Sequence, residues 1–159
     1  MKLRIISVGH KMPAWVETAC AEYIKRMPRE LPIEMIDIKP EKRAAGKNTQ
    51  NVQESEAKRI IDTTGKDKTK HLIVACDERG EEINTLQLAE KLLNWQSVGK
   101  DINIIVGGAD GLHASIKQSA DFVWGLSKLT LAHAFVRVLL CEQLYRAHSV
   151  KQNHPYHRE

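Results

Sequence analysis

The residues best suited to holding a small molecule are the glycines of IIVGGADGL, at positions 104–112. An apolar segment that reads as a buried strand runs directly into Gly107, Gly108 and Gly111. Glycine has no Cβ, so it lets the backbone approach a ligand more closely than any other residue does. The same glycines also fit a plain turn between a strand and a helix, and the stretch alone leaves both interpretations open.

Two familiar phosphate-binding motifs do not fit this glycine cluster. A dinucleotide-binding G-x-G-x-x-G ending at Gly111 would need glycine at position 106, where the chain has Val106. The acidic residue expected about 20 positions later would fall near Leu131. A P-loop requires G-K-[ST], which this stretch lacks. The cluster therefore predicts neither a dinucleotide site nor a P-loop.

A second candidate segment is LSKLTL, at positions 126–131, which follows another expected strand and precedes the last helix. A third is the end of the apolar strand at 72–76, where Asp77 follows Cys76. In open parallel sheets, ligands bind in a crevice outside the carboxyl ends of the strands. We therefore expect these three strand ends to line one crevice.

Strands and helices alternate along the whole chain, which predicts an α/β fold. We expect one domain spanning 1–159, with a mostly parallel sheet and helices on both faces. Periodicity and the positions of glycine and proline place the elements. The expected strands are 3–8, 33–38, 72–76, 102–106 and 122–126, and the expected helices are 13–24, 52–63, 85–98, 113–119 and 134–149.

The amino-acid composition is that of a soluble globular protein. Hydrophobic residues make up 42% and charged residues 28%, as in soluble globular proteins, and the net charge of +4 is compatible with a nucleic-acid partner. The three cysteines lie far apart without a C-x-x-C pair, so neither a disulfide framework nor a metal site is expected. No segment approaches the roughly 18 apolar residues of a membrane span, and no signal peptide is apparent. We expect a cytoplasmic protein.

Four stretches together resemble one known family in order and spacing: LIVACDERG, IIVGGADGL, LSKLTLAHAFVRVLLCEQLYRA and NHPYHRE. The family is that of ribosomal RNA large subunit methyltransferase H (RlmH), in the SPOUT superfamily. The resemblance covers the whole chain. It implies an enzyme that uses S-adenosylmethionine to methylate N3 of a pseudouridine in helix 69 of 23S rRNA. It also implies a deep trefoil knot in the C-terminal part, which periodicity does not predict and which general topology rules disfavour.

The resemblance implies a cofactor pocket made from the three strand ends. A loop lined by leucines, with backbone groups at its edge, suits adenine, which is apolar on its faces and forms hydrogen bonds at its edge. Cys76 would be a small wall residue or plain core, and the leucines could also belong to the core. The implied cofactor-binding residues are Cys76, Gly107, Leu126, Ser127, Lys128, Leu129, Thr130 and Leu131.

Catalytic groups are implied in the C-terminal tail. Methylation of N3 requires that a weakly acidic proton leaves, which calls for a base or for a cation that favours the anion. We expect Tyr156 and Arg158 on the substrate side and His157 as a proton acceptor. The alternative is that the tail is simply a frayed chain end.

The RNA-binding surface and the assembly state are less clearly indicated. Arg137 and Arg146 are candidate RNA contacts, although Arg146 could instead pair with Glu142 one turn away. The excess of apolar residues in the helix at 134–149 predicts a homodimer, in which one subunit's tail or loop could complete the other's site. The loop after position 38 is a modest basic surface for RNA or an ordinary solvated face, through Lys39, Lys42, Arg43 and Lys47.

Two other functions remain as alternatives. One is a SPOUT methyltransferase that acts on tRNA, against which the tail NHPYHRE argues. The other is an RNA-binding module without catalysis. Such modules stack bases on clustered aromatic side chains, whereas aromatic residues here are only 5% and scattered.

Overall fold

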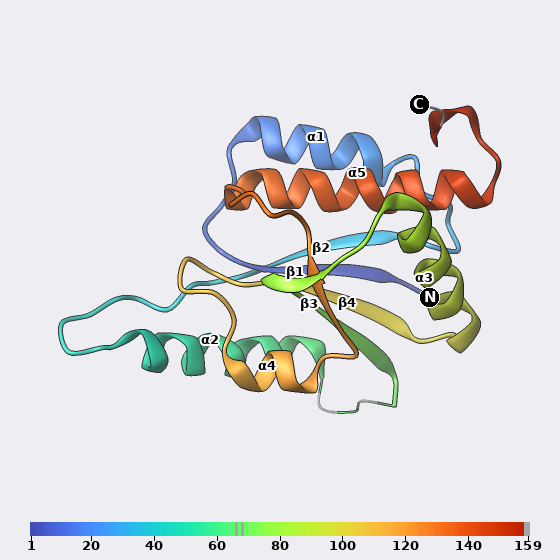
Figure 1. Cartoon of the computed structure of the whole chain (residues 1–159). Helices are drawn as coiled ribbons and strands as arrows, with labels where there is room; N and C mark the ends of the chain where they lie inside the picture. The colour runs from blue at the N-terminus through green and yellow to red at the C-terminus, as the bar shows by residue number, and fades with distance from the viewer. Residues whose placement is uncertain (66, 68, 158–159) are drawn as a thin grey trace.

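The computed structural model describes residues 1–65, 67 and 69–157. It contains a five-stranded sheet in the order β2-β1-β4-β3-β5, with every neighbouring pair parallel. Helices cover both faces of the sheet (Figure 1), so the predicted α/β class is confirmed. The elements are β1 (Leu3–Val8), α1 (Ala14–Ile24), β2 (Ile33–Ile38), α2 (Thr49–Thr64), β3 (His71–Glu82), α3 (Thr85–Val98), β4 (Asp101–Val106), α4 (Ala114–Ser119), β5 (Phe122–Gly125), α5 (His133–Lys151) and the short 3-10 helix η1 (Pro155–His157).

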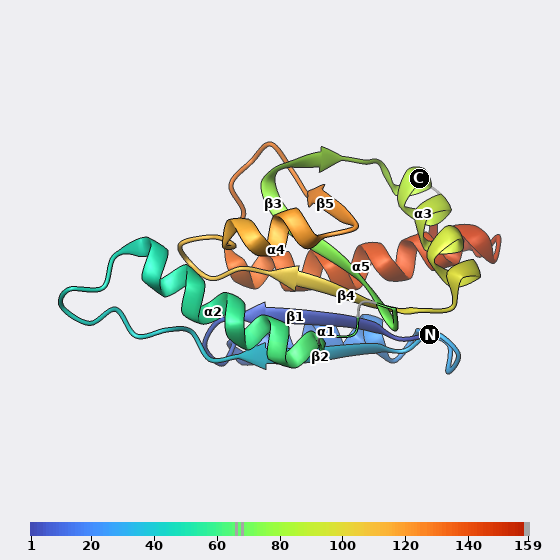
Figure 2. The ribbon, with the colours of Figure 1, turned by 90° about the horizontal axis from the view of Figure 1, so that it is seen from below.

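Two hydrophobic cores hold the three layers together. Successive side chains of a strand point to opposite faces, so Leu3 and Ile5 pack with α1, α3 and α5, whereas Ile6 and Val8 pack with α2 and α4. The view from below shows α2 and α4 on the face opposite α1 and α5 (Figure 2). Burial on both faces explains why these strands read as continuous apolar runs in the sequence.

The β3 strand is longer than the sequence predicts. The expected strand ended at Cys76, but β3 continues to Glu82 and pairs with β5 a second time after a register shift between Cys76 and Glu81. A Cβ added to Gly80 would lie 2.5 Å from the backbone N of Gly125, so only glycine permits this crossing. The extension was missed because DERGEE is polar and reads as a loop, although its backbone pairs with β5.

The ends of the helices largely follow local signals. Asn84 caps α3 in a capping box with Gln87, and Gly99 ends it in the left-handed conformation. The α2 helix begins at Thr49 after an Asn48 cap, one turn earlier than expected. The early start was missed because the first turn is polar and shows no apolar periodicity. Within the residues described, no helix is both long and apolar enough to cross a membrane. The trefoil knot stays a prediction.

Candidate active site

Sheet register brings the three predicted cofactor segments side by side. Cys76 on β3 pairs with Val106 of β4 on one side and with Trp124 of β5 on the other. The loops at 107–112 and 126–131 follow β4 and β5, the two strands that flank β3, just after these pairs. The three predicted segments therefore lie side by side at the carboxyl ends of β4 and β5, although Cys76 lies within β3 at its register shift and not at its end. The crevice between them stays a prediction.

The glycines at the end of β4 serve to close the loop on itself. A Cβ on Gly107 would lie 2.9 Å from the carbonyl carbon of Gly111 and 3.0 Å from Leu112. Gly111 has φ +76°, and Gly108 and Gly111 form an isolated bridge across the turn. The close approach that the sequence indicated is thus an approach of the loop to its own backbone. These contacts bear out a turn at this position, and a ligand-facing role of the glycines stays a prediction.

The same loop packs against α2, a contact that the sequence did not predict. The Gln53 amide donates to the Asp110 carbonyl at 2.6 Å, and a Cβ on Gly108 would lie 3.2 Å from the carboxylate of buried Glu56. Arg43 pairs with the Asp110 carboxylate at 2.5 Å. Neither Gln53 nor Glu56 belongs to a recognisable motif, so only the fold could identify them.

Two of the four basic side chains of the predicted loop, Arg43 and Lys47, form ion pairs. Besides the pair of Arg43 with Asp110, Lys47 lies 2.8 Å from the Glu41 carboxylate, which also pairs with Arg59. Arg59 donates to the Lys39 carbonyl at 2.7 Å. These contacts order the loop, and its role as a basic surface for RNA stays a prediction.

The loop between β5 and α5 presents both polar and apolar groups. Leu126 packs against the core, and the Ser127 hydroxyl accepts a hydrogen bond from the Leu129 N–H at 2.9 Å. Lys128, Leu129 and Thr130 are exposed, and Leu129 is 76% exposed. Leu131 is half-buried. Leu129 is therefore not a core residue, whereas Leu126 partly is.

Cys76 lies at the centre of this edge and packs against the core. Burial raises the pKa of its thiol to about 12. A thiol with such a pKa stays protonated near neutral pH, and the thiolate is the nucleophilic form. This pKa argues against a nucleophilic role for Cys76, and its role as a wall residue stays a prediction.

A buried polar cluster borders the same edge. Arg137, on the second turn of α5, is 3% exposed and donates from Nη1 to the Asp37 carboxylate at 2.5 Å. His133, one turn earlier, lies over Gly9 and near the Gly107 carbonyl. Burial and the nearby Arg137 charge lower the pKa of His133, so its ring is neutral at pH 7. The prediction that Arg137 contacts RNA is wrong, because the side chain points under α5 into this cluster.

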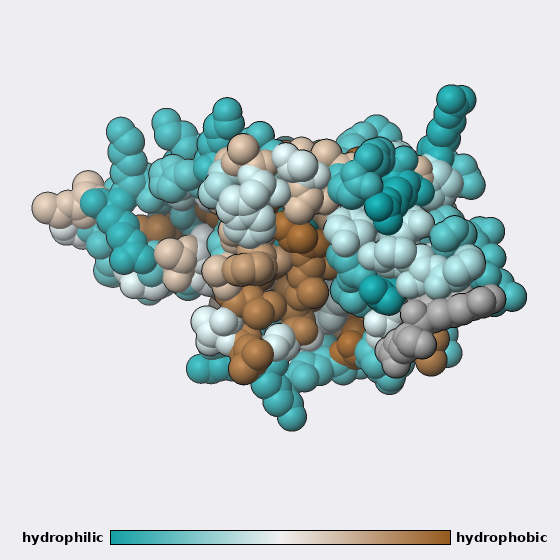
Figure 3. Space-filling view, turned by 90° about the horizontal axis from the view of Figure 1, so that it is seen from above, coloured by the Kyte–Doolittle hydropathy of each residue, from teal (hydrophilic) through white to brown (hydrophobic). Residues whose placement is uncertain are grey.

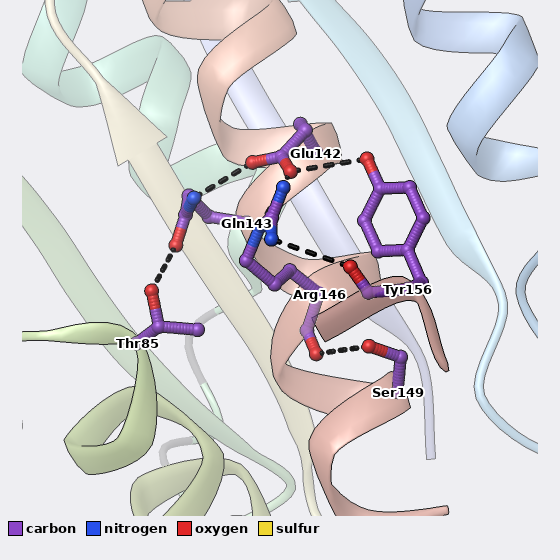
Figure 4. Close-up of polar contacts among 6 residues, drawn as sticks. All are labelled: Thr85, Glu142, Gln143, Arg146, Ser149 and Tyr156. Atoms are coloured by element: carbon purple, nitrogen blue, oxygen red, sulfur yellow. Dashed lines mark hydrogen bonds and ion pairs between the residues drawn. The ribbon is translucent and has the colours of Figure 1, made fainter. Parts of the chain in front are cut away.

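The C-terminal tail is docked on α5 through Tyr156. Its hydroxyl donates to Glu142 at 3.1 Å, and Arg146 pairs with the same carboxylate at 2.8 Å and donates to the Tyr156 carbonyl at 3.4 Å (Figure 4). The pairing of Arg146 with Glu142 bears out the alternative considered for that arginine. Burial, a hydrogen bond with Tyr23 and the Glu142 charge raise the pKa of Tyr156. The predicted Arg158 and the side chain of His157 lie outside the described residues.

The tail and the cofactor segments lie at opposite ends of α5 (Figure 1). The helix has 19 residues and is therefore about 28 Å long. In one chain the predicted cofactor residues thus lie together, whereas Tyr156 contacts Glu142 at the middle of α5, roughly 14 Å along the helix from His133.

Two cavities, of about 260 and 290 Å³, open between α2 and α4 and contain none of the predicted site residues. Among the described residues, no group of three or more His, Cys, Asp or Glu side chains is arranged to hold a metal ion. The carboxyl edge therefore remains the candidate site.

Comparison with known proteins identifies the family. The family model described as "Predicted SPOUT methyltransferase" matches residues 1–157. A protein named ribosomal RNA large subunit methyltransferase H from Methylobacillus flagellatus is 60% identical over 159 residues, which is 100% of both chains. Its namesake from Cupriavidus metallidurans is 53% identical over 158 residues, 99% of each chain.

A solved structure has the same fold at low sequence identity. It is described as a probable methylase family protein from Haemophilus influenzae Rd KW20 and superposes with a TM-score of 0.57 at 14% identity, covering 99% of this chain and 70% of that chain. Matches of this extent over the whole sequence leave no doubt about kinship. The chain belongs to the SPOUT methyltransferase family and, within it, to the family of ribosomal RNA large subunit methyltransferase H.

Proposed function

We propose that the chain is an S-adenosylmethionine-dependent methyltransferase that modifies N3 of a pseudouridine in helix 69 of 23S rRNA, with the assembled ribosome as its substrate. The observation that carries the proposal is the register that places Cys76 between the loops at 107–112 and 126–131. Relatives that match the full chain are named as large subunit rRNA methyltransferases. The site in the cell would be the cytoplasm, where ribosomes work.

The residues at the carboxyl edge fit the proposed cofactor. Exposed Leu129 and half-buried Leu126 and Leu131 offer apolar surface to the faces of adenine. Neighbouring backbone groups of the 126–131 loop suit the hydrogen-bonding edge of the base. The neutral thiol of Cys76 adds a small wall that does not compete for the methyl group. The proposed cofactor-binding set is Cys76, Gly107 and the six residues from Leu126 to Leu131.

The bound cofactor would supply a methyl group on a positively charged sulfur, and the carbon of that methyl group is the electrophile. The chain's part is to align the nucleophilic N3 with that methyl group and to remove the N3 proton. We assign proton acceptance to His157 and stabilisation of the N3 anion to Arg158. The raised pKa of Tyr156 and its bond to Glu142 suit an anchoring role for that residue rather than a basic one.

A homodimer would join the two halves of the site. In its own chain the tail leaves the far end of α5, and its Tyr156 docks no nearer to the cofactor loops than Glu142 at mid-helix, so a second subunit is the simplest source of a tail at that edge. The face formed by α1 and α5 carries a band of hydrophobic side chains (Figure 3). Trp15 and Phe135 pack together on these helices at 5.5 Å between ring centroids while remaining 49% and 60% exposed.

Replacing this aromatic pair is expected to dissociate the dimer. Buried aromatic anchors each contribute about 2 kcal/mol or more to association, so Trp15→Asp and Phe135→Asp should each weaken dimerisation at least about 30-fold. Sedimentation equilibrium at micromolar concentration measures this. Leu86→Asp is the matched control, because Leu86 is 61% exposed but lies on α3. A wild-type protein that sediments as a monomer would exclude the homodimer.

Mass spectrometry of rRNA tests the reaction. Ribosomes that lack the modification are incubated with the protein and S-adenosylmethionine, and helix 69 fragments are analysed for one added methyl group on a pseudouridine. Naked 23S rRNA and bulk tRNA serve as parallel substrates. Methylation of tRNA instead of rRNA would favour the tRNA alternative. Failure to bind either S-adenosylmethionine or its demethylated product would favour an RNA-binding module without catalysis.

A further inference from the structure

Three side chains beside the candidate site, two of them buried and that of His133 partly buried, hold buried polar atoms that no described residue satisfies. They are the Ser7 hydroxyl, both ring nitrogens of His133, and Nε and Nη2 of Arg137. Ser7 shares its side of β1 with Leu3 and Ile5, which pack in the core under α5. All three side chains therefore lie at one end of the sheet, beneath the start of α5. Buried polar groups in native proteins are nearly always hydrogen-bonded, so this concentration indicates a bound polar group.

The geometry of Arg137 indicates which kind of polar group would bind there. Its Nη1 donates to Asp37, whereas the two nitrogens without a partner, Nε and Nη2, form one edge of the guanidinium. The parallel N–H groups of such an edge match the two oxygens of a carboxylate. Asp37 is 56% exposed, so water screens its charge and the arginine remains an attractive partner for a second anion.

The guanidinium edge of Arg137 that has no partner lies beside the glycine loop at 107–112. A Cβ on Gly9, at the end of β1, would lie 3.4 Å from Nη2 of Arg137 and 3.1 Å from the His133 ring. The Gly107 carbonyl lies close enough to His133 to affect its pKa. The cluster thus adjoins the glycine loop on the side of β1, away from the 126–131 loop that suits adenine.

We propose that Arg137, with His133 beside it, binds the α-carboxylate at the methionine end of S-adenosylmethionine. The proposal rests on the proposed function. It adds a subsite under the first two turns of α5. The carboxylate is the only anionic group of this cofactor, and the adenine end is accounted for by the loop at 126–131. Neutral His133 donates one N–H to the carboxylate, and the free Arg137 edge supplies two.

The test compares two ligands by calorimetry on the full-length protein. Decarboxylated S-adenosylmethionine lacks only the carboxylate, so the wild type should bind it about 10- to 100-fold more weakly than S-adenosylmethionine. Equal affinity for the two ligands would overturn the proposal without any variant. Binding of neither ligand would instead refute the proposed function, so the two failures are distinguishable.

Variants then locate the subsite. Arg137→Lys keeps the charge for Asp37 but loses the two-pronged edge, and it should lower the preference for the carboxylated ligand to within about threefold. His133→Gln should reduce it partially. Two controls are used. Arg4→Lys lies near the start of β1, at the end of that strand away from Gly9. His148→Gln changes a second partly buried histidine of α5.

A loss of affinity that is equal for both ligands in Arg137→Lys would show a merely structural arginine and overturn the assignment. Thermal melting accompanies each variant. If Arg137→Lys does not fold, His133→Gln gives the same ligand comparison, and an undiminished preference in that variant, with a folded protein, counts against the subsite.

Discussion

Removal of residues 154–159 is expected to abolish methyl transfer to ribosomes while leaving the affinity for S-adenosylmethionine unchanged within about twofold. The tail docks on the second half of α5 through contacts of Tyr156 with Glu142 and Arg146, and the cofactor segments end at Leu131. The two functions are therefore separated in space within one chain. Calorimetry measures cofactor affinity, and transfer of a labelled methyl group to ribosomes measures turnover.

Within the tail, Arg158→Ala isolates the proposed cation. Loss of one charge-assisted hydrogen bond, worth about 1.5–3 kcal/mol, predicts a fall of roughly 10- to 150-fold in kcat/KM. Lys151→Ala is the matched control, because Lys151 is an exposed cation at the end of α5 that contacts Gln96. Saturating ribosomes should not restore the rate if Arg158 acts in the transition state. A truncated enzyme with normal turnover would disprove any role of the tail.

The fold was predictable because its strands are buried on both faces and are therefore visible in the sequence as apolar runs. The alternation of such runs with amphipathic segments predicted the parallel sheet and its two helical layers. The exception is the second half of β3, whose polar residues pair through the backbone alone. A pattern of side chains carries no information about pairing of that kind, and the glycines that permit it, Gly80 and Gly125, look like turn residues.

Only those parts of the candidate site that form continuous sequence motifs could be predicted. Loop motifs located Cys76, Gly107 and the 126–131 segment, and the parallel sheet explains why they meet. Arg137 was misassigned to RNA because charge suggests exposure, whereas an ion pair with Asp37 allows it to be buried. Gln53 and Glu56 contact the glycine loop from a helix more than 50 residues earlier in the chain, a distance that no local pattern spans.

Gly107→Val is expected to abolish measurable binding of S-adenosylmethionine. Even a single Cβ there would lie 2.9 Å from the backbone of Gly111 and 3.0 Å from Leu112. Overpacking costs about 1–3 kcal/mol where neighbours can move, and here the neighbours are largely backbone, so the loop must be displaced. The buried strand before it, with Ile102, Ile104 and Ile105 fully buried, should keep the fold. Ala109→Val, in the same loop but exposed, is the control, and unchanged affinity by calorimetry would leave Gly107 a turn residue only.

Mixing the two inactive proteins then determines which subunit supplies the tail. The truncated subunit keeps its cofactor loops, and the Gly107→Val subunit keeps its tail. If the tail acts on the partner's site, each mixed dimer contains one complete site. Because half of the dimers in a random equal mixture are mixed and each has one good site of two, roughly a quarter of wild-type activity should return in a two-fold symmetric dimer. If the tail served its own chain, no dimer would hold a complete site and the mixture would stay inactive. Continued inactivity of the mixture would contradict the shared site.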